Sequence, residues 1–169
     1  MKILTLLRHA KSGWDDPSLP DFERPLNARG RAAARAIGAE MRRLGLAWDC
    51  VLASPAARVT QTIDGLAESC GPLAPVYDER VYLATAETLL ALVRAADDGC
   101  ESLLIVGHNP GLERLALLLG RPGPLRDEIA AKYPTGALAE IAFPVDHWRD
   151  AGPSGGTLAR FTRPRDLQG

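Results

Sequence analysis

The chain has 169 residues, the length of one ordinary domain, and predicts a single domain over residues 1–169. Hydrophobic residues make up 46% of it and charged residues 24%, a globular composition that excludes a disordered or fibrous chain. Lys and Arg number 20, Asp and Glu 21, so the formal charge of −1 argues against a nucleic-acid coat or a polybasic membrane anchor.

The N-terminus and the cysteines bear on the compartment of the protein. The apolar run at residues 3–7 is too short for the core of a signal peptide or for a membrane span. Cys50, Cys70 and Cys100 are odd in number and widely spaced, which excludes a disulfide framework and suits a reducing environment. We therefore expect a cytoplasmic protein that does not bind a membrane.

Strand and helix patterns alternate from the start of the chain. The apolar residues 3–7 end abruptly at Arg8 and His9, which is typical of a buried strand. After a loop rich in prolines and acids, Asn27 is suited to cap a helix whose apolar residues recur at helical spacing. Gly45 is suited to end that helix.

The alternation continues through the middle of the chain. A second strand at residues 50–53 leads into a helix that begins at Ser54-Pro55 and ends at Gly71. A third short strand is predicted at residues 75–77, and Thr85 is suited to cap the next helix.

The last predicted elements complete the pattern that indicates the fold class. A strand at residues 103–106 is followed at once by the sequence GHNPG and an apolar helix at 112–119. The final quarter contains two further strands, 137–143 and 157–162, joined by a glycine-rich loop. Repeated strand–helix alternation predicts an α/β fold, a three-layer α/β/α sandwich with a mainly parallel central sheet and helices on both faces.

Four side chains are candidates for a site at one edge of this sheet. His9 and His108 each follow a strand directly, and ligands of such sheets gather at the carboxyl ends of the strands. Arg8 precedes His9, and Arg58 lies close to a helix N-terminus with its free N–H groups. Together they would make a compact pocket for an anion, and phosphate uses such donors best. Taken alone, a histidine is more often structural than catalytic and an arginine is more often a solvated surface residue, so the prediction depends on the four occurring together.

Metal and nucleotide sites are not indicated. No HxxxH or HxH spacing exists, and the neighbouring arginines would repel a cation. The glycines of GHNPG do not form a Walker-type loop, and neither a GxSxG elbow nor a CxxxxxR phosphatase loop is present. We therefore expect no metal site.

Four motifs in this order resemble those of the histidine phosphatase superfamily, which is also called phosphoglycerate mutase-like. They are LRHA at 7–10, PLNARG at 25–30, SPAARVTQT at 54–62 and GHNPG at 107–111. The short chain, the sequence RHAKS and the GHNPG motif most resemble the SixA-type phosphohistidine phosphatase branch. The resemblance covers residues 2–143 and implies a phosphoglycerate mutase-like fold without a metal or organic cofactor.

The resemblance also implies a mechanism. His9 would be the nucleophile, neutral and with its other ring N–H held by a backbone carbonyl, and would form a phosphohistidine enzyme intermediate. Arg8, Arg58 and His108 would bind the phosphoryl group and stabilise the charge of its transition state.

A general acid is needed where the leaving group is an alkoxide. The mutase branch carries a glutamate in the context NERxYG, and the similar sequence DERVYL here points to Glu79. Asp78 is the second candidate for the acid, and the segment is equally compatible with an ordinary exposed acidic turn that has no catalytic role. The match is partial, because Leu83 stands where the motif has its final glycine. Because a phosphorylated imidazole leaves more readily than an alcohol, an enzyme acting on phosphohistidine could work with a weak acid.

The sequence departs from the family pattern just after the nucleophile. Ala10 stands where the motif usually has glycine, and a residue this small should leave the loop intact. Lys11, Ser12 and Arg24 are further candidates to contact phosphate or substrate.

We expect a phosphatase that acts on protein phosphohistidine, such as that of a histidine phosphotransfer domain in signal transduction. The short chain lacks the insertions that cap mutase sites over small sugars, and an open site suits a protein-borne phosphohistidine. The alternatives are a small-molecule phosphomonoesterase or mutase, and a catalytically inactive phospho-binding protein. The physiological substrate and the oligomeric state stay open.

Overall fold

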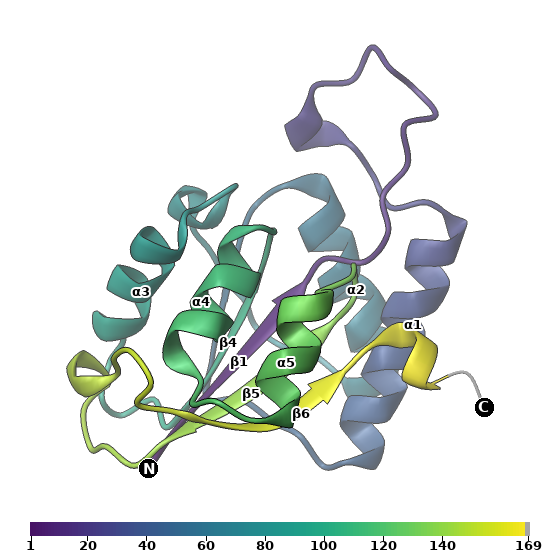
Figure 1. Cartoon of the computed structure of the whole chain (residues 1–169). Helices are drawn as coiled ribbons and strands as arrows, with labels where there is room; N and C mark the ends of the chain where they lie inside the picture. The colour runs from purple at the N-terminus through teal and green to yellow at the C-terminus, as the bar shows by residue number, and fades with distance from the viewer. Residues whose placement is uncertain (168–169) are drawn as a thin grey trace.

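The computed structural model describes residues 1–167 and contains a six-stranded sheet between two layers of helices (Figure 1). The strands are β1 (Lys2–Arg8), β2 (Cys50–Ala53), β3 (Val76–Tyr77), β4 (Ser102–Gly107), β5 (Leu138–Phe143) and β6 (Thr157–Thr162). Their order is β3-β2-β4-β1-β5-β6, with the first four parallel and β5 and β6 joined by antiparallel pairing. The predicted α/β sandwich with a mainly parallel sheet is thus confirmed.

The helices cover both faces of the sheet. On one face lie α1 (Ala28–Arg43) and α2 (Ala57–Cys70). On the other lie α3 (Ala86–Arg94), α4 (Gly111–Leu119) and α5 (Pro124–Ala131). Short 3₁₀ turns complete the chain at η1 (Asp21–Glu23), η2 (Glu79–Val81), η3 (Trp148–Asp150) and η4 (Pro164–Leu167). No helix within residues 1–167 has both the length and the apolar character needed to cross a membrane.

Local signals position the helices much as predicted. The Asn27 side chain accepts a hydrogen bond from the Gly30 amide at 2.8 Å at the start of α1, and Thr85 caps α3 in the same way. Gly45 adopts a φ of +68° just beyond α1, a conformation that glycine adopts readily. The second helix begins at Ala57, later than predicted, because Ser54 uses its hydroxyl to accept the Ala56 amide in a preceding turn.

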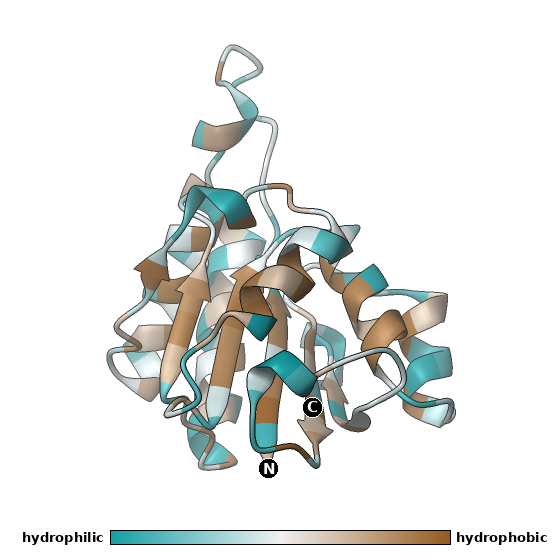
Figure 2. Ribbon diagram, turned by 90° about the vertical axis from the view of Figure 1, so that its left-hand side faces the viewer, coloured by the Kyte–Doolittle hydropathy of each residue, from teal (hydrophilic) through white to brown (hydrophobic). Residues whose placement is uncertain are grey.

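Side-chain alternation along the central strands divides the core in two. In β1, Leu4 and Leu6 pack toward α3, α4 and α5, whereas Leu7 packs toward α1 and α2. Figure 2 shows the resulting concentration of hydrophobic residues along these strands. Trp148 is fully buried at the edge of the first cluster and donates its indole N–H to the Cys100 carbonyl at 2.6 Å. The sheet is therefore held rigidly between two apolar layers.

A loop over residues 9–27 connects β1 to α1 and projects beyond the carboxyl ends of the strands, at the top of Figure 1. Its base is closed by a bridge between Ser12 and Leu26 and by the Asn27 amide, which donates to the Lys11 carbonyl at 3.0 Å. A Cβ at Gly30 would lie 2.0 Å from the Lys11 carbonyl oxygen, so only glycine lets α1 approach the loop this closely. The fold thereby fixes the loop above the edge of the sheet.

Candidate active site

The four side chains singled out in the sequence lie together at the carboxyl edge of the sheet. Arg8 is the last residue of β1 and His9 follows it, whereas His108 follows β4, the parallel neighbour of β1. The His9 amide donates to the Gly107 carbonyl at 3.0 Å, which aligns the two strand ends. The ring centroids of His9 and His108 are 5.4 Å apart. Arg58 reaches the same place from the first turn of α2.

The backbone fixes which ring nitrogen of His9 carries hydrogen. Nδ1 of His9 lies 2.7 Å from the carbonyl oxygen of Ala10, and a carbonyl can only accept. Nδ1 therefore holds the hydrogen, and Nε2 has a free electron pair. Burial, together with the nearby charges of Arg58 and Arg8, lowers the pKa of His9 to about 4. His9 is thus a neutral base at pH 7.

Helix α2 fixes the Ala10 peptide that orients His9. The Ala10 amide donates to Oγ1 of Thr62 at 2.9 Å, and the Thr62 hydroxyl donates to the Arg58 carbonyl at 2.6 Å. Ala10 lies outside the left-handed backbone region that favours glycine, so alanine fits a position where the motif usually has glycine.

His108 is also held in one neutral form. Nη2 of Arg58 lies 3.3 Å from Nδ1 of His108, and a guanidinium can only donate, so Nδ1 is an acceptor. Nε2 then carries the hydrogen and donates to the Ser54 hydroxyl at 2.8 Å. Burial and the charge of Arg58 lower the pKa of His108 to about 3. The Nε2–H group of His108 is consequently a neutral donor.

Asp21 of the projecting loop holds Arg58 in place. Arg58 donates from Nη1 to the Asp21 carbonyl at 2.8 Å and from Nη2 to Oδ2 of the same residue at 3.0 Å. Asp21 also accepts from the Tyr82 hydroxyl at 2.5 Å and from Arg24 at 3.0 Å. Burial alone would raise the pKa of Asp21, but the hydrogen bonds from Tyr82, Arg24 and Arg58 hold it well below its usual range. Asp21 is therefore a carboxylate, not a proton donor, at neutral pH.

The arginines keep donors that the protein does not use. Arg8 makes one side-chain hydrogen bond, from Nη1 to the Tyr133 carbonyl at 3.0 Å. The Nε–H groups of Arg8, Arg24 and Arg58 are buried and have no hydrogen-bond partner within residues 1–167. Donors withheld from water in this way favour an anion that can use them.

These side chains surround a cavity of about 530 Å³, here called the catalytic cavity. Its lining residues are Arg8, His9, Lys11, Ser12, Trp14, Asp21, Arg24, Arg58, Leu83, His108, Asn109, Lys132, Pro134 and Thr135. Five of them are Lys or Arg and one is an acid, so with neutral histidines the lining carries a net charge of +4. Among the described residues, no three His, Cys, Asp or Glu side chains lie close enough together to hold a metal ion. The cavity is built to attract an anion.

The structure does not bring Glu79 to this cavity. Glu79 begins the short turn η2, is exposed, and is absent from the lining residues. Asp78 caps the same turn by accepting from the Arg80 amide at 2.9 Å and forms an ion pair with the Arg80 side chain. Two later residues of this segment reach the site: Tyr82, through its hydrogen bond to Asp21, and Leu83, which lines the cavity.

Sequence reasoning missed several residues of the site. Asp21 lies in an acidic loop whose pattern does not distinguish it from its neighbours Asp15 and Asp16. Lys132 and Thr135 follow α5, a helix that was not predicted because it buries one apolar residue, Ile129. The available signal was Pro124 after Gly123, a helix start with proline in the first turn.

Comparison with known proteins identifies relatives over nearly the whole chain. Residues 4–82 match the model of the histidine phosphatase superfamily (branch 1). An uncharacterized protein of Mycobacterium tuberculosis is 35% identical over 164 residues, which cover 94% of this chain and 100% of the relative.

Solved structures extend the likeness to the fold. The "putative phosphohistidine phosphatase SixA" of Agrobacterium tumefaciens is 31% identical with a TM-score of 0.79, covering 96% of this chain and 98% of that one. Its namesake from Nakamurella multipartitia is 27% identical with a TM-score of 0.83, covering 96% of each chain. Because sequence and structure agree over almost the full length, we conclude that the chain belongs to the histidine phosphatase superfamily.

Proposed function

We propose that this chain is a phosphatase that transfers the phosphoryl group of a protein phosphohistidine to His9 and then to water. The observation that carries the proposal is the contact between Nδ1 of His9 and the Ala10 carbonyl. It leaves Nε2 as a free base in a cavity lined by Arg8, Arg58 and His108. The SixA names of the two solved relatives support phosphohistidine as the substrate.

In the first step, Nε2 of His9 attacks phosphorus and the P–N bond of the substrate breaks. The substrate imidazole, protonated on its other ring nitrogen, takes the electron pair of that bond and leaves as neutral imidazole. The phosphorylated ring of His9 then carries a positive charge, which the Ala10 carbonyl stabilises through the Nδ1–H hydrogen bond. No protein side chain has to supply a proton.

In the second step, water attacks phosphorus and the P–Nε2 bond breaks. The electron pair returns to Nε2, and His9 becomes neutral again. Both hydrogens of the water stay with the product, which leaves as dihydrogen phosphate and then ionises in solvent. Arg8 and Arg58 stabilise the phosphoryl oxygens in both steps, while His108, held by Ser54 through Nε2–H, positions Arg58 through Nδ1.

The charge state of Asp21 favours this substrate over an alcohol ester. Asp21 is the acidic side chain of the cavity lining, and three donors keep it ionised. An alcohol leaves as an alkoxide unless an acid protonates it, whereas a protonated phosphoimidazole leaves as a neutral ring. We therefore propose that phosphohistidine hydrolysis proceeds without Glu79 or Asp78 as acid.

The mouth of the cavity suits a protein substrate. Trp14 and Leu83 line the cavity with 66% and 54% of their surface exposed, and Phe22, 39% exposed, packs edge-on against Tyr82 beside them. Large apolar side chains left in water around a site are typical of protein contacts. They support a phosphohistidine presented on the surface of a partner, such as a phosphotransfer domain, rather than a small phosphoester.

The test compares phosphate release from a phosphorylated histidine phosphotransfer domain and from p-nitrophenyl phosphate. Wild type should turn over the phosphoprotein much faster, and His9→Ala should abolish turnover by removing the nucleophile, about 10³-fold or more. His147→Ala, which removes an exposed histidine paired with Asp98, is the matched control and should stay active. Unchanged turnover in His9→Ala would overturn the mechanism. Efficient turnover of the small ester alone would move the function to metabolite hydrolysis.

A further inference from the structure

A second pocket of about 330 Å³ opens beside the catalytic cavity and is called the basic groove here. Its lining residues are Lys11, Arg29, Ala33, Lys132, Pro134, Thr135, Arg163, Pro164 and Arg165. Lys11, Lys132, Pro134 and Thr135 also line the catalytic cavity, so the two spaces adjoin. One ligand can therefore occupy both.

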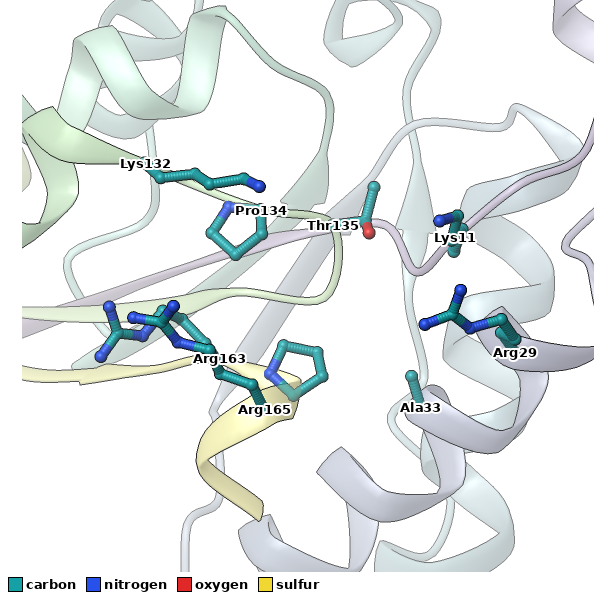
Figure 3. Close-up of a pocket in the computed structure, with 9 residues that line it drawn as sticks. Lys11, Arg29, Ala33, Lys132, Pro134, Thr135, Arg163 and Arg165 are labelled. Carbon is teal, nitrogen blue, oxygen red and sulfur yellow. The ribbon is translucent and has the colours of Figure 1, made fainter. Parts of the chain in front are cut away.

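The basic groove collects positive charge from distant parts of the sequence. Figure 3 shows Arg29 and Lys132 extending into it from opposite sides, with Pro134 and Thr135 between them. Five lining side chains are Lys or Arg and none is acidic, although the whole chain has a formal charge of −1. Like charges held around one concavity repel each other and attract an anion.

Ion pairs neutralise only part of this charge. Arg163 pairs with Asp166 at 3.1 Å, and Arg165 approaches the same carboxylate at 4.0 Å. Within residues 1–167, Lys11, Arg29 and Lys132 have no carboxylate within ion-pair distance. These three cations are left for a ligand.

The form of the groove favours an acidic peptide segment over a compact polyanion. Arg29, Lys132 and Arg165 are exposed, so the groove is open at its edges. Its walls include the apolar surfaces of Ala33, Pro134 and Pro164, which can contact a backbone or aliphatic stems. Cations spread in this way match carboxylates spaced along a chain.

We propose that the basic groove binds carboxylate side chains of the phosphorylated protein, close to the phosphohistidine that enters the catalytic cavity. This inference rests on the function proposed above and makes the groove a determinant of which phosphoprotein is accepted. Arg29 and Arg165 are specificity residues in this arrangement, and neither lines the catalytic cavity.

The test uses two synthetic peptides that each contain one histidine, phosphorylated with phosphoramidate. The acidic peptide carries glutamates on both sides of the histidine, and the neutral peptide carries glutamines at the same positions. For wild type we expect kcat/KM to be at least about fivefold higher for the acidic peptide, through a lower KM. The preference should shrink as NaCl rises from 50 to 300 mM, because salt screens exposed charges.

The variants separate the groove from the catalytic site. Arg29→Gln/Arg165→Gln should bring the ratio of the two kcat/KM values close to one, whereas Arg29→Lys should keep the preference. Arg42→Gln removes an exposed charge from the last turn of the same helix and should leave the ratio unchanged. Turnover of phosphoramidate by each variant reports whether the catalytic cavity is intact.

Two results would overturn the inference. The first is equal kcat/KM for both peptides in wild type; if tripolyphosphate then inhibits in a way that depends on Arg29 and Arg165, the groove binds a small polyanion. The second is a preference for the acidic peptide that is unchanged in Arg29→Gln/Arg165→Gln. Failure of wild type to hydrolyse either peptide or phosphoramidate would instead overturn the proposed function.

Discussion

The imidazole of His9 is oriented by the carbonyl of Ala10, the next residue in the chain, across 2.7 Å. Because the acceptor belongs to the backbone, no substitution of a partner side chain can remove it. The Ala10 peptide is in turn tied to α2 through Thr62. The ring of His9, the proposed nucleophile, is therefore oriented by the same contacts that hold the end of β1 in place.

The pH dependence of the free enzyme should follow the low pKa of His9. Attack requires neutral His9, whose pKa is lowered to about 4, so protonation of His9 should lower kcat/KM only below about pH 5, whereas any decline toward pH 8 should follow loss of the proton from the substrate imidazole. NMR titration of the histidine ring protons, assigned with His9→Ala, checks this directly. A His9 titration midpoint near 6.5 would contradict it.

Asp21→Asn should separate catalysis from anion binding. The change removes a negative charge from the catalytic cavity, which does not weaken binding of a phosphate anion. It also replaces one of the two carboxylate oxygens, which accept from Arg58, Tyr82 and Arg24, by an NH₂ group, so Arg58 is held less firmly. We expect kcat to fall about tenfold, while the inhibition constant of inorganic phosphate stays the same or decreases.

Asp16→Asn is the matched control for Asp21→Asn. Asp16 lies in the same loop, is exposed, and its side chain accepts hydrogen bonds from the amide and hydroxyl of Ser18. Replacement of Asp16 should leave both kcat and the inhibition constant of inorganic phosphate unchanged. A parallel rise in the phosphate inhibition constant with Asp21→Asn would show that Asp21 supports binding rather than the transition state.

Glu79→Gln should change phosphohistidine turnover by less than about twofold, because Glu79 is exposed and does not line the cavity. An effect confined to phosphomonoesters would assign Glu79 to protonation of alcohol leaving groups. Steady-state assays on a phosphohistidine protein and on a phosphomonoester test both statements. Equal and strong slowing of both substrates would refute the coupling between acid and substrate.

Asn27→Ala should affect both stability and activity. Loss of the cap should lower the free energy of unfolding by about 1 kcal/mol, measured in urea. The backbone amide of Asn27 still donates to the Lys11 carbonyl in the variant, but it now belongs to a frayed first turn of α1, so the loop above the site should loosen and KM should rise.

The matched variant Thr85→Ala removes the cap of α3, because the Thr85 hydroxyl accepts the hydrogen bond of the Thr88 amide. It should destabilise the protein by a similar amount, with no change in kinetics. Equal kinetic effects of the two variants would mean that the loop responds to global stability alone.

Local patterns account for what the sequence could predict. The caps at Asn27 and Thr85 depend on contacts within one helical turn. The burial of β1 follows from the apolar residues of the strand itself. His9 and His108 could be placed together because parallel strands end at one edge of a sheet. The proximity of His9 and His108 therefore follows from the parallel direction of the two strands that precede them.

The remainder of the site depends on contacts that no local pattern encodes. Asp21 meets Arg58 37 residues later in the chain, across a loop without periodicity. The helix α2 starts at Ala57 and not at the predicted Ser54-Pro55, because the Ser54 hydroxyl closes a turn before the helix. Tyr82 reaches Asp21, while Glu79 of the same motif faces water, and only the three-dimensional path of the segment separates them.

The turn η4 packs against α1, which brings Arg163 and Arg165 beside the cavity of His9, the proposed nucleophile. In the proposed arrangement, the groups that react and the groups that select the phosphoprotein come from segments far apart in the sequence. Substitutions at Arg163 or Arg165 would then change the preference for a phosphoprotein while His9 and its neighbours keep their positions. Under the proposed function, relatives that differ at these positions would accept different phosphoproteins and share one phosphoryl-transfer chemistry.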